Sequence, residues 1–229
     1  MNIHWLQHAD FEDLGCIAPW LAARGDDMSC TRLYAGEVPP NVADFDALIV
    51  MGGPMNIYEY EKYQWLKAEK QLIRAAIQSG KRVLGICLGS QLIADVLGGP
   101  VTRNAQPEIG WFDVSLNDAG RASPLLDEFP PCFFAFHWHG DTFAIPPGAE
   151  LLGSSEACAN QIYSACEGRV IATQFHLEVT AANARDWLAH EQPAPARYVQ
   201  TPEEMLREIP RFAENNRLML SLLERWLRA

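Results

Sequence analysis

The sequence lacks long apolar runs and carries little positive charge. No apolar stretch approaches the roughly 20 residues that a membrane-spanning helix requires. The 18 lysine and arginine residues are outnumbered by 29 aspartate and glutamate residues, which leaves a net charge of −11. Nucleic acids and anionic membrane surfaces repel a chain of this charge. We therefore expect neither nucleic acid nor a membrane as a partner.

The sequence also has no closely spaced cysteine pair, and its start does not predict a secretion signal. The six cysteines include no C-x-x-C pair, so the sequence predicts neither a zinc site nor the disulfide framework of a secreted protein. The first six residues do not form the basic segment followed by an apolar one that marks a secretion signal. We expect a cytoplasmic protein that acts on small molecules or other proteins and needs no cofactor.

The predicted elements alternate between strand and helix, which is typical of an α/β fold. With 229 residues the chain can bury a sizeable core and is expected to form one domain. The sequence predicts strands over 3–6, 28–33 and 45–51, and helices over 14–23 and 63–78. After residue 100, short segments between Gly, Pro and Asn predict further strands, several of them antiparallel, over 111–116, 132–136, 151–153, 161–164 and 170–173.

One cysteine lies at the apex of a predicted nucleophile elbow. Cys87 stands in Gly-Ile-Cys-Leu-Gly-Ser-Gln, after an apolar strand and before a helix-like run over 91–97. Gly85 and Gly89 remove the side chains that would collide at a sharp turn, and the helix start favours a thiolate. A lone cysteine in an α/β protein is more often inert and buried, so its role depends on partners elsewhere.

A histidine and a glutamate at the end of a later strand supply such partners. His176 and Glu178 follow the apolar segment 170–173, and residues two apart in extended chain project to the same side. Glu178 can then orient the imidazole toward a thiol, as in a catalytic triad. A His-x-Glu pair is mostly structural when it stands alone. Together with the elbow, it predicts a catalytic site.

Two further segments have both a structural and a functional interpretation. The loop Gly52-Gly53-Pro54 is a tight turn after a strand, but the N–H of Gly53 could also stabilise an oxyanion beside the N–H of Leu88. The segment His137-Trp-His-Gly-Asp141 offers metal-binding side chains. Its two histidines lie two apart beside a tryptophan with no second cluster of suitable spacing, so we predict no metal site.

These motifs, in this order and spacing, resemble the class I (triad-type) glutamine amidotransferases. They are G-I-C-L-G-S-Q, M-G-G-P-M-N, H-W-H-G-D and F-H-L-E, and the resemblance covers the chain from Ile3 to about Leu188. It is strongest to free-standing proteins similar to the glutaminase domain of GMP synthetase. Two positions depart from the family pattern: Asn56 stands where Ser is frequent, and Leu177 stands where Pro is common between the histidine and the glutamate.

The resemblance implies a fold and a set of site residues. The fold is a doubly wound, mostly parallel, flavodoxin-like sheet flanked by helices, with additional antiparallel strands in the C-terminal half. Asp141 would bind the substrate's α-amino group. The implied residues are the triad Cys87, His176 and Glu178, the backbone oxyanion donors Gly53 and Leu88, and the substrate-binding residues Gln91, His139, Gly140 and Asp141.

Residues 1–190 are expected to form the amidotransferase domain, and residues 191–229 a linker followed by C-terminal helices. Proline residues separate the two parts over 191–196, and Pro202 with two glutamates suits the start of a short helix. The segment after Pro210 has an apolar face. We expect it to pack on the same domain, with a partner-binding helix as the alternative.

Three functions agree with these observations. The first is a glutaminase that releases ammonia and glutamate and needs a separate synthetase subunit, because the sequence has neither an S-G-G-x-D-S-like loop nor a G-x-x-x-x-G-K-[ST] motif. The second is a self-sufficient hydrolase of γ-glutamyl amides or peptides. The third is a non-catalytic regulatory relative, which the intact triad argues against.

Overall fold

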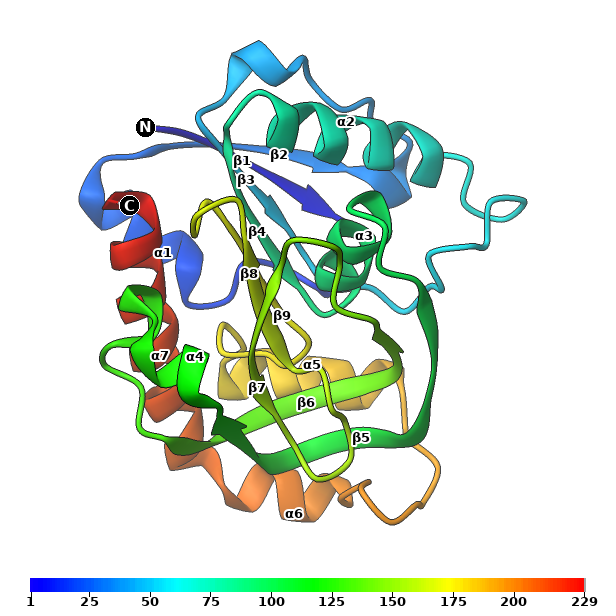
Figure 1. Ribbon diagram of the computed structural model, residues 1–229. Helices are drawn as coiled ribbons and strands as arrows, with labels where there is room; N and C mark the ends of the chain where they lie inside the picture. Colours follow the sequence, from blue (N-terminus) through cyan, green and yellow to red (C-terminus); the bar gives the residue numbers. More distant parts are fainter. Residues whose placement is uncertain (229) are drawn as a thin grey trace.

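A mixed sheet of nine strands runs through the computed structural model, which describes residues 1–228 (Figure 1). The strand order is β2-β1-β3-β4-β9-β8-β7-β5-β6. The strands are β1 (Asn2–Gln7), β2 (Asp27–Arg32), β3 (Ala47–Val50), β4 (Arg82–Ile86), β5 (Val101–Leu116), β6 (Cys132–Phe143), β7 (Glu150–Ser154), β8 (Ile162–Ala165) and β9 (Val170–Thr173).

Five strands form a parallel half of this sheet. β1 pairs in parallel with β2 and β3, β3 with β4, and β4 with β9. Every residue of β3 and β9 is buried, because helices or other strands cover both faces of the sheet there. The doubly wound, mostly parallel fold expected from the sequence is therefore confirmed.

Helices cover the two faces of the parallel half, with α1 and α7 on one side and α2 and α3 on the other (Figure 1). Alternate residues of β1 show this division, since Ile3 packs with α1 and α7 while Leu6 packs with α2 and α3. The helices are α1 (Ile17–Arg24), α2 (Leu66–Gln78), α3 (Leu88–Val96), α4 (Asp118–Ala122), α5 (Ala181–His190), α6 (Pro202–Arg207) and α7 (Ile209–Arg228), with 3-10 turns at Leu33–Ala35, Val42–Asp44 and Pro124–Leu126.

A long antiparallel hairpin, β5–β6, forms one edge of the sheet. The sequence predicted only its inner halves, over 111–116 and 132–136. β5 continues across Pro107, although proline has no N–H to donate to the neighbouring strand. This is possible because the register shifts between Arg103 and Glu108, and residues in such a bulge need not form the regular hydrogen bonds between strands. The segment over 137–141, which lies beyond the predicted strand, is consequently part of β6 and is fixed by its pairing with β5.

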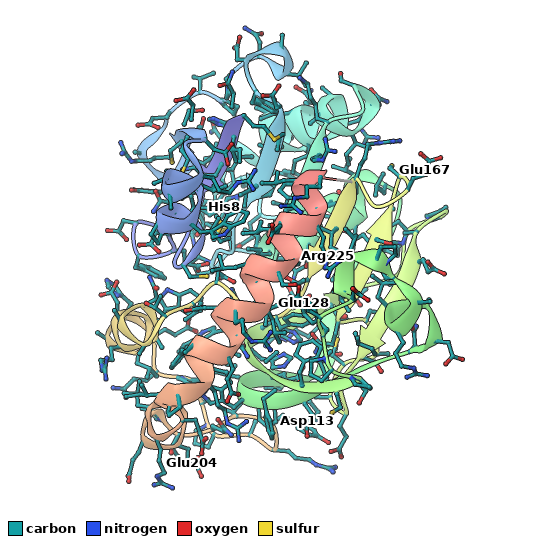
Figure 2. All side chains as sticks on the ribbon, turned by 90° about the vertical axis from the view of Figure 1, so that its left-hand side faces the viewer. His8, Asp113, Glu128, Glu167, Glu204 and Arg225 are labelled. Carbon is teal, nitrogen blue, oxygen red and sulfur yellow. The ribbon has the colours of Figure 1, made fainter. Side chains whose placement is uncertain are left out.

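The C-terminal helix α7 lies across the face of the sheet that also carries α1 (Figure 2). Its residues Leu218, Leu222 and Trp226 are buried in the same cluster as strand residues of β1, β3, β4 and β9. Arg225 forms ion pairs with Asp127 and Glu128 at its exposed side. Across the described residues 1–228, no helix is long and apolar enough to cross a membrane.

Candidate active site

The predicted site residues come together at the carboxyl ends of the parallel strands. The elbow follows β4, and the segment with His176 and Glu178 follows the neighbouring parallel strand β9. Gly53 follows β3. Open α/β sheets hold their ligands at this edge, because loops after adjacent parallel strands converge there. Segments about 90 residues apart in sequence therefore form one site.

Cys87 occupies a strained position at the apex of the elbow. Its φ of 51° and ψ of −106° lie in a region that side chains disfavour, and its side chain is buried. The turn depends on Gly89, since a Cβ there would lie 2.0 Å from the carbonyl oxygen of Val50. Helix α3 begins directly at Leu88, so the N–H of this residue has no partner within its own helix.

The thiol of Cys87 has polar neighbours from three directions. Gln174 Nε2 lies 3.7 Å from Sγ, and Sγ lies 3.6 Å from the carbonyl oxygen of Trp138. The side chains of Cys87 and His176 line the same cavity, and Cys87 contributes to raising the pKa of His176. Gln91, a predicted substrate residue, donates through its amide to Gln174 at 3.2 Å. The nucleophile candidate thus lies beside a buried amide network and shares a cavity with the base candidate.

His176 and Glu178 form a buried pair. His176 Nδ1 lies 2.6 Å from Glu178 Oε1, and both residues are at most 2% exposed. Burial lowers the pKa of His176, but the charge of Glu178, its hydrogen bond to the ring and the neighbouring Cys87 together outweigh burial and hold the pKa well above its usual value. The imidazole is therefore charged at neutral pH, and Glu178 fixes which nitrogen faces the sulfur.

The Gly52-Gly53 loop lies against a second buried histidine pair. His8 Nδ1 donates to the carbonyl oxygen of Gly52 at 2.8 Å, and His8 Nε2 lies 2.6 Å from Glu69 Oε1 of α2. Burial lowers the pKa of His8, but the Glu69 carboxylate, the Gly52 carbonyl and the charge of Glu12 together outweigh burial, so the net pKa is raised. A Cβ on Gly53 would lie 2.8 Å from atoms of both His8 and Leu88. The two predicted oxyanion donors are therefore neighbours.

Glu12, in the loop after β1, brings an additional carboxylate to the site. A Cβ on Gly52 would lie 2.3 Å from Glu12 Oε2 and 3.2 Å from Cε1 of His176, so both groups adjoin Gly52. Burial raises the pKa of Glu12 to about 7, although the positive charges of His176 and His8 oppose this. A carboxylate with this pKa is half ionised at neutral pH, which is typical of functional sites.

A cavity of about 410 Å³ connects these groups with the predicted substrate residues. Asp141 lies at its wall and accepts from Asn56 Nδ2 at 2.7 Å, and Arg103 lies 3.4 Å away. His139 and Gly140 also line the cavity. The departure from the family pattern at position 56 therefore supplies a hydrogen bond to Asp141. Such a volume is within the range of about 300–1,000 Å³ usual for small-molecule sites.

The segment that carries Asp141 is held by a buried carboxylate of β5. Glu108 Oε2 lies 3.0 Å from His139 Nε2 and 2.6 Å from Gln161 Nε2. Of the groups described, Glu108, His137 and His139 are those whose arrangement could hold a metal ion. Hydrogen bonds already occupy the Glu108 oxygen that the histidines face, which supports a role in fixing β6 for this cluster.

Sequence reasoning missed Glu12, His8 as a site residue, and Gln174. Their common signal is position, since each follows a parallel strand at its carboxyl end. Glu69 gave no signal of this kind, because it lies within the helix α2, where it is buried and contacts His8.

Comparisons with known proteins give consistent matches. The family model described as "Glutamine amidotransferase class-I" matches residues 28–191. The chain is 36% identical over 214 residues to the glutamine amidotransferase-like protein YfeJ of Salmonella typhimurium, a match that covers 90% of the chain and 89% of YfeJ. It is 34% identical over 137 residues to one subunit of the glutamine-hydrolysing GMP synthase of Sulfurisphaera tokodaii, covering 59% of the chain and 69% of that relative.

Solved structures of similar proteins match over the whole chain. A glutamine amidotransferase of Thermotoga maritima has a TM-score of 0.88 at 30% identity, with 100% of this chain and 99% of that chain covered. A glutamine amidotransferase of Methylobacillus flagellatus has a TM-score of 0.92 at 31% identity, with 99% and 94% covered.

Proposed function

Because the chain belongs to the class I glutamine amidotransferase family, we propose that it hydrolyses the γ-carboxamide of glutamine or of a related γ-glutamyl compound through a thioester on Cys87. The products from glutamine are glutamate and ammonia. Cys87, His176 and Glu178 act as nucleophile, acid–base and orienting residue. The observation that carries this proposal is the buried His176–Glu178 pair, which shares one cavity with a cysteine at the apex of an elbow.

The first half-reaction forms the thioester. The sulfur of Cys87 attacks the side-chain carbonyl, and negative charge develops on the carbonyl oxygen. The N–H groups of Gly53 and Leu88 stabilise this oxyanion, which such donors do more effectively when they are fixed before the reaction. The imidazolium of His176 then gives its proton to the departing nitrogen, and the C–N bond breaks.

The second half-reaction uses the same groups. His176, now neutral, takes a proton from water, and the resulting hydroxide attacks the thioester carbonyl. Glutamate leaves, and the Cys87 thiolate again lies beside the protonated ring of His176. Glu178 holds the imidazole in one orientation through both steps, since its hydrogen bond to Nδ1 leaves Nε2 directed to the sulfur and the substrate.

The substrate's amino-acid end is assigned to the part of the cavity around Asp141. Asp141 binds the α-amino group, and Gln91, His139 and Gly140 shape the surrounding wall. The match to a component of a GMP synthase supports a separate synthetase as a recipient of the ammonia. A γ-glutamyl amide with a larger leaving group is the second candidate substrate. The carboxylates of Glu12 and Glu191, which also line the cavity, favour it.

Glutamate release tests this proposal directly. Purified protein is assayed with glutamine and with γ-glutamyl peptides, and the acid-quenched protein is examined by mass spectrometry for a γ-glutamyl adduct. Cys87→Ala is expected to abolish both signals. Cys132→Ala serves as a matched control, because Cys132 is exposed at the far end of β6. Full turnover by Cys87→Ala would refute the assigned nucleophile.

A further inference from the structure

The cavity has two chemically different ends. At the first end, Asn56 and Arg103 each contact Asp141. Two residues at the second end are Glu12 and Glu191, which line the same cavity. Arg103 and Asp141 carry opposite charges, so the first end suits the α-carboxylate and the α-amino group of an amino acid. The second end has an excess of negative charge.

Aromatic side chains accompany the carboxylates at the second end. Trp187 donates from its indole nitrogen to the carbonyl oxygen of Phe11 at 3.1 Å, which places it beside the residue that precedes Glu12. Trp138 lies edge-on to Trp187, with ring centroids 5.7 Å apart, and its indole nitrogen lies 3.4 Å from Glu191. Aromatic faces combined with carboxylates are a common environment for organic cations.

Glu12 lacks a counter-charge of its own. The two charged histidines near it are already paired, His8 with Glu69 and His176 with Glu178. Among the described residues, no side chain forms a hydrogen bond or an ion pair with the Glu12 carboxylate. Glu12 is nevertheless only 9% exposed, and it faces the cavity. A buried carboxylate without a partner is costly unless a ligand supplies one.

The place of Glu12 relative to the reacting atoms indicates which part of a ligand it would meet. Glu12 Oε2 and Cε1 of His176 both adjoin Gly52. The rings of His176 and Trp187 also pack edge to face, with centroids 4.9 Å apart. The leaving nitrogen must reach His176 to take its proton, so a group attached to that nitrogen extends toward Glu12 and the aromatic side chains.

We propose that Glu12 binds a positively charged group on the leaving amine, so that the preferred substrates are γ-glutamyl amides of amines that carry a second, protonated amino group. This inference rests on the proposed function and specifies its substrate class. The reaction remains a hydrolysis: water adds across the amide, the C–N bond breaks, and the diamine leaves with its distal ammonium group unchanged. Glu191 and the faces of Trp138 and Trp187 contribute to the same site.

Three matched amides test the proposal. They are γ-glutamyl amides of an unbranched four-carbon amine whose far end carries an ammonium, a methyl or a carboxylate group. For the wild-type protein at pH 8, we expect kcat/KM to be at least about tenfold higher for the ammonium compound than for the methyl compound, a difference of about 1.4 kcal/mol. The carboxylate compound should be the poorest of the three.

Two variants separate this site from a general charge effect. Glu12→Gln keeps the shape of the side chain and should reduce the ammonium-to-methyl ratio to near one, while hydrolysis of the methyl compound persists. Asp10→Asn removes the same charge from an exposed neighbour in the same loop and should leave the ratio unchanged. An unchanged ratio in Glu12→Gln, or a wild-type ratio near one, would overturn the inference. Failure to hydrolyse any γ-glutamyl compound would instead count against the proposed function.

Discussion

At the scale of single residues, Glu12 combines an energetic cost with a position beside the reacting groups. Its carboxylate adjoins His176, and burial raises its pKa to about 7. The nearby charges are the cations of His176 and His8, which favour its ionisation, and the carboxylates of Glu178 and Glu191, which oppose it. Residues that reduce stability in this way are retained mainly where function needs them.

Glu12→Gln is expected to stabilise the protein at high pH. The pKa of Glu12 is higher in the folded state than its ordinary value of 4.5, so ionisation is easier after unfolding. The resulting loss of stability develops as the pH rises from about 4.5 to 7 and is complete above that range. The shift corresponds to at most about 3 kcal/mol, at 1.36 kcal/mol per pH unit. Urea unfolding at pH 5 and pH 8 measures it.

The informative quantity is how the effect of each substitution on the free energy of unfolding differs between pH 5 and pH 8. Glu12→Gln should gain free energy of unfolding over the wild type mainly at pH 8, whereas Asp10→Asn should show no such pH-dependent gain. If Glu12→Gln were equally or more destabilised at pH 8 than at pH 5, the carboxylate would have a favourable partner in the folded protein.

The His8–Glu69 pair is expected to act on the oxyanion site through one peptide bond. The carbonyl of Gly52 accepts from His8, and the N–H of Gly53 belongs to the same peptide group. A donor at the carbonyl polarises that group and strengthens its N–H as a donor. Glu69→Gln weakens the charge on His8, so kcat should fall about tenfold while KM stays nearly unchanged. This loss is smaller than the roughly 10²–10³-fold fall in kcat that follows removal of an oxyanion donor itself.

Steady-state kinetics with glutamine would separate this positioning role from a general loss of structure. A structural defect lowers the melting temperature along with kcat, whereas the positioning role lowers kcat in a protein that melts near the wild-type temperature. An unchanged kcat in folded Glu69→Gln would show that the pair does not influence the oxyanion donors.

At the scale of secondary structure, the sequence predicted best those elements that are determined by residues close together in the chain. The elbow was recognisable because only glycine fits at positions 85 and 89, where a Cβ would lie within 2.7 Å of backbone atoms. The triad segment was recognisable because β9 is a short apolar strand that ends directly before it. Strand β6 was predicted too short, because its pairing with β5 depends on a bulge that sequence periodicity does not reveal.

The part of the site that sequence could not supply depends on long-range contacts. His8 and Glu69 are 61 residues apart, and only the packing of α2 against the sheet brings them together. Glu69 lies on a helix whose amphipathic pattern assigns a glutamate to the surface, yet it is fully buried. Glu12 likewise lies in a loop, and its importance follows from the neighbouring Gly52 and His176.

Helix α7 contacts the segment of the proposed base His176 and its partner Glu178 through one side chain. Asn216 Nδ2 donates to the carbonyl oxygens of Leu177 and Val179, at 2.8 and 2.9 Å, on either side of Glu178. Asn216→Ala removes both bonds, so we expect a loss of about 1–3 kcal/mol in stability and a several-fold lower kcat. Arg217→Ala, at an exposed neighbouring position, is the control and should change neither. Activity equal to wild type in Asn216→Ala would exclude this support.

At the scale of the whole molecule, we propose that residues 1–190 and 191–229 form one folding unit. The buried face of α7 belongs to the largest apolar cluster, together with α1 and the centre of the sheet. Trp226 is fully buried and donates from its indole nitrogen to the carbonyl oxygen of Arg169 at 2.9 Å. Its own carbonyl accepts from Arg82 Nε at 2.8 Å, beside the start of β4.

This arrangement predicts that the chain cannot be shortened to its amidotransferase-like part. A protein ending at residue 190 would expose the sheet face that α7 covers, so we expect it to be insoluble or to lack a cooperative unfolding transition. Trp226→Ala is the milder test, with an expected loss of about 3–5 kcal/mol for a fully buried tryptophan. Both proteins are compared with the full chain by circular dichroism and urea unfolding. If residues 1–190 alone unfolded cooperatively at the wild-type midpoint and retained glutaminase activity, α7 would be an appendage, and its apolar face would be free for a partner.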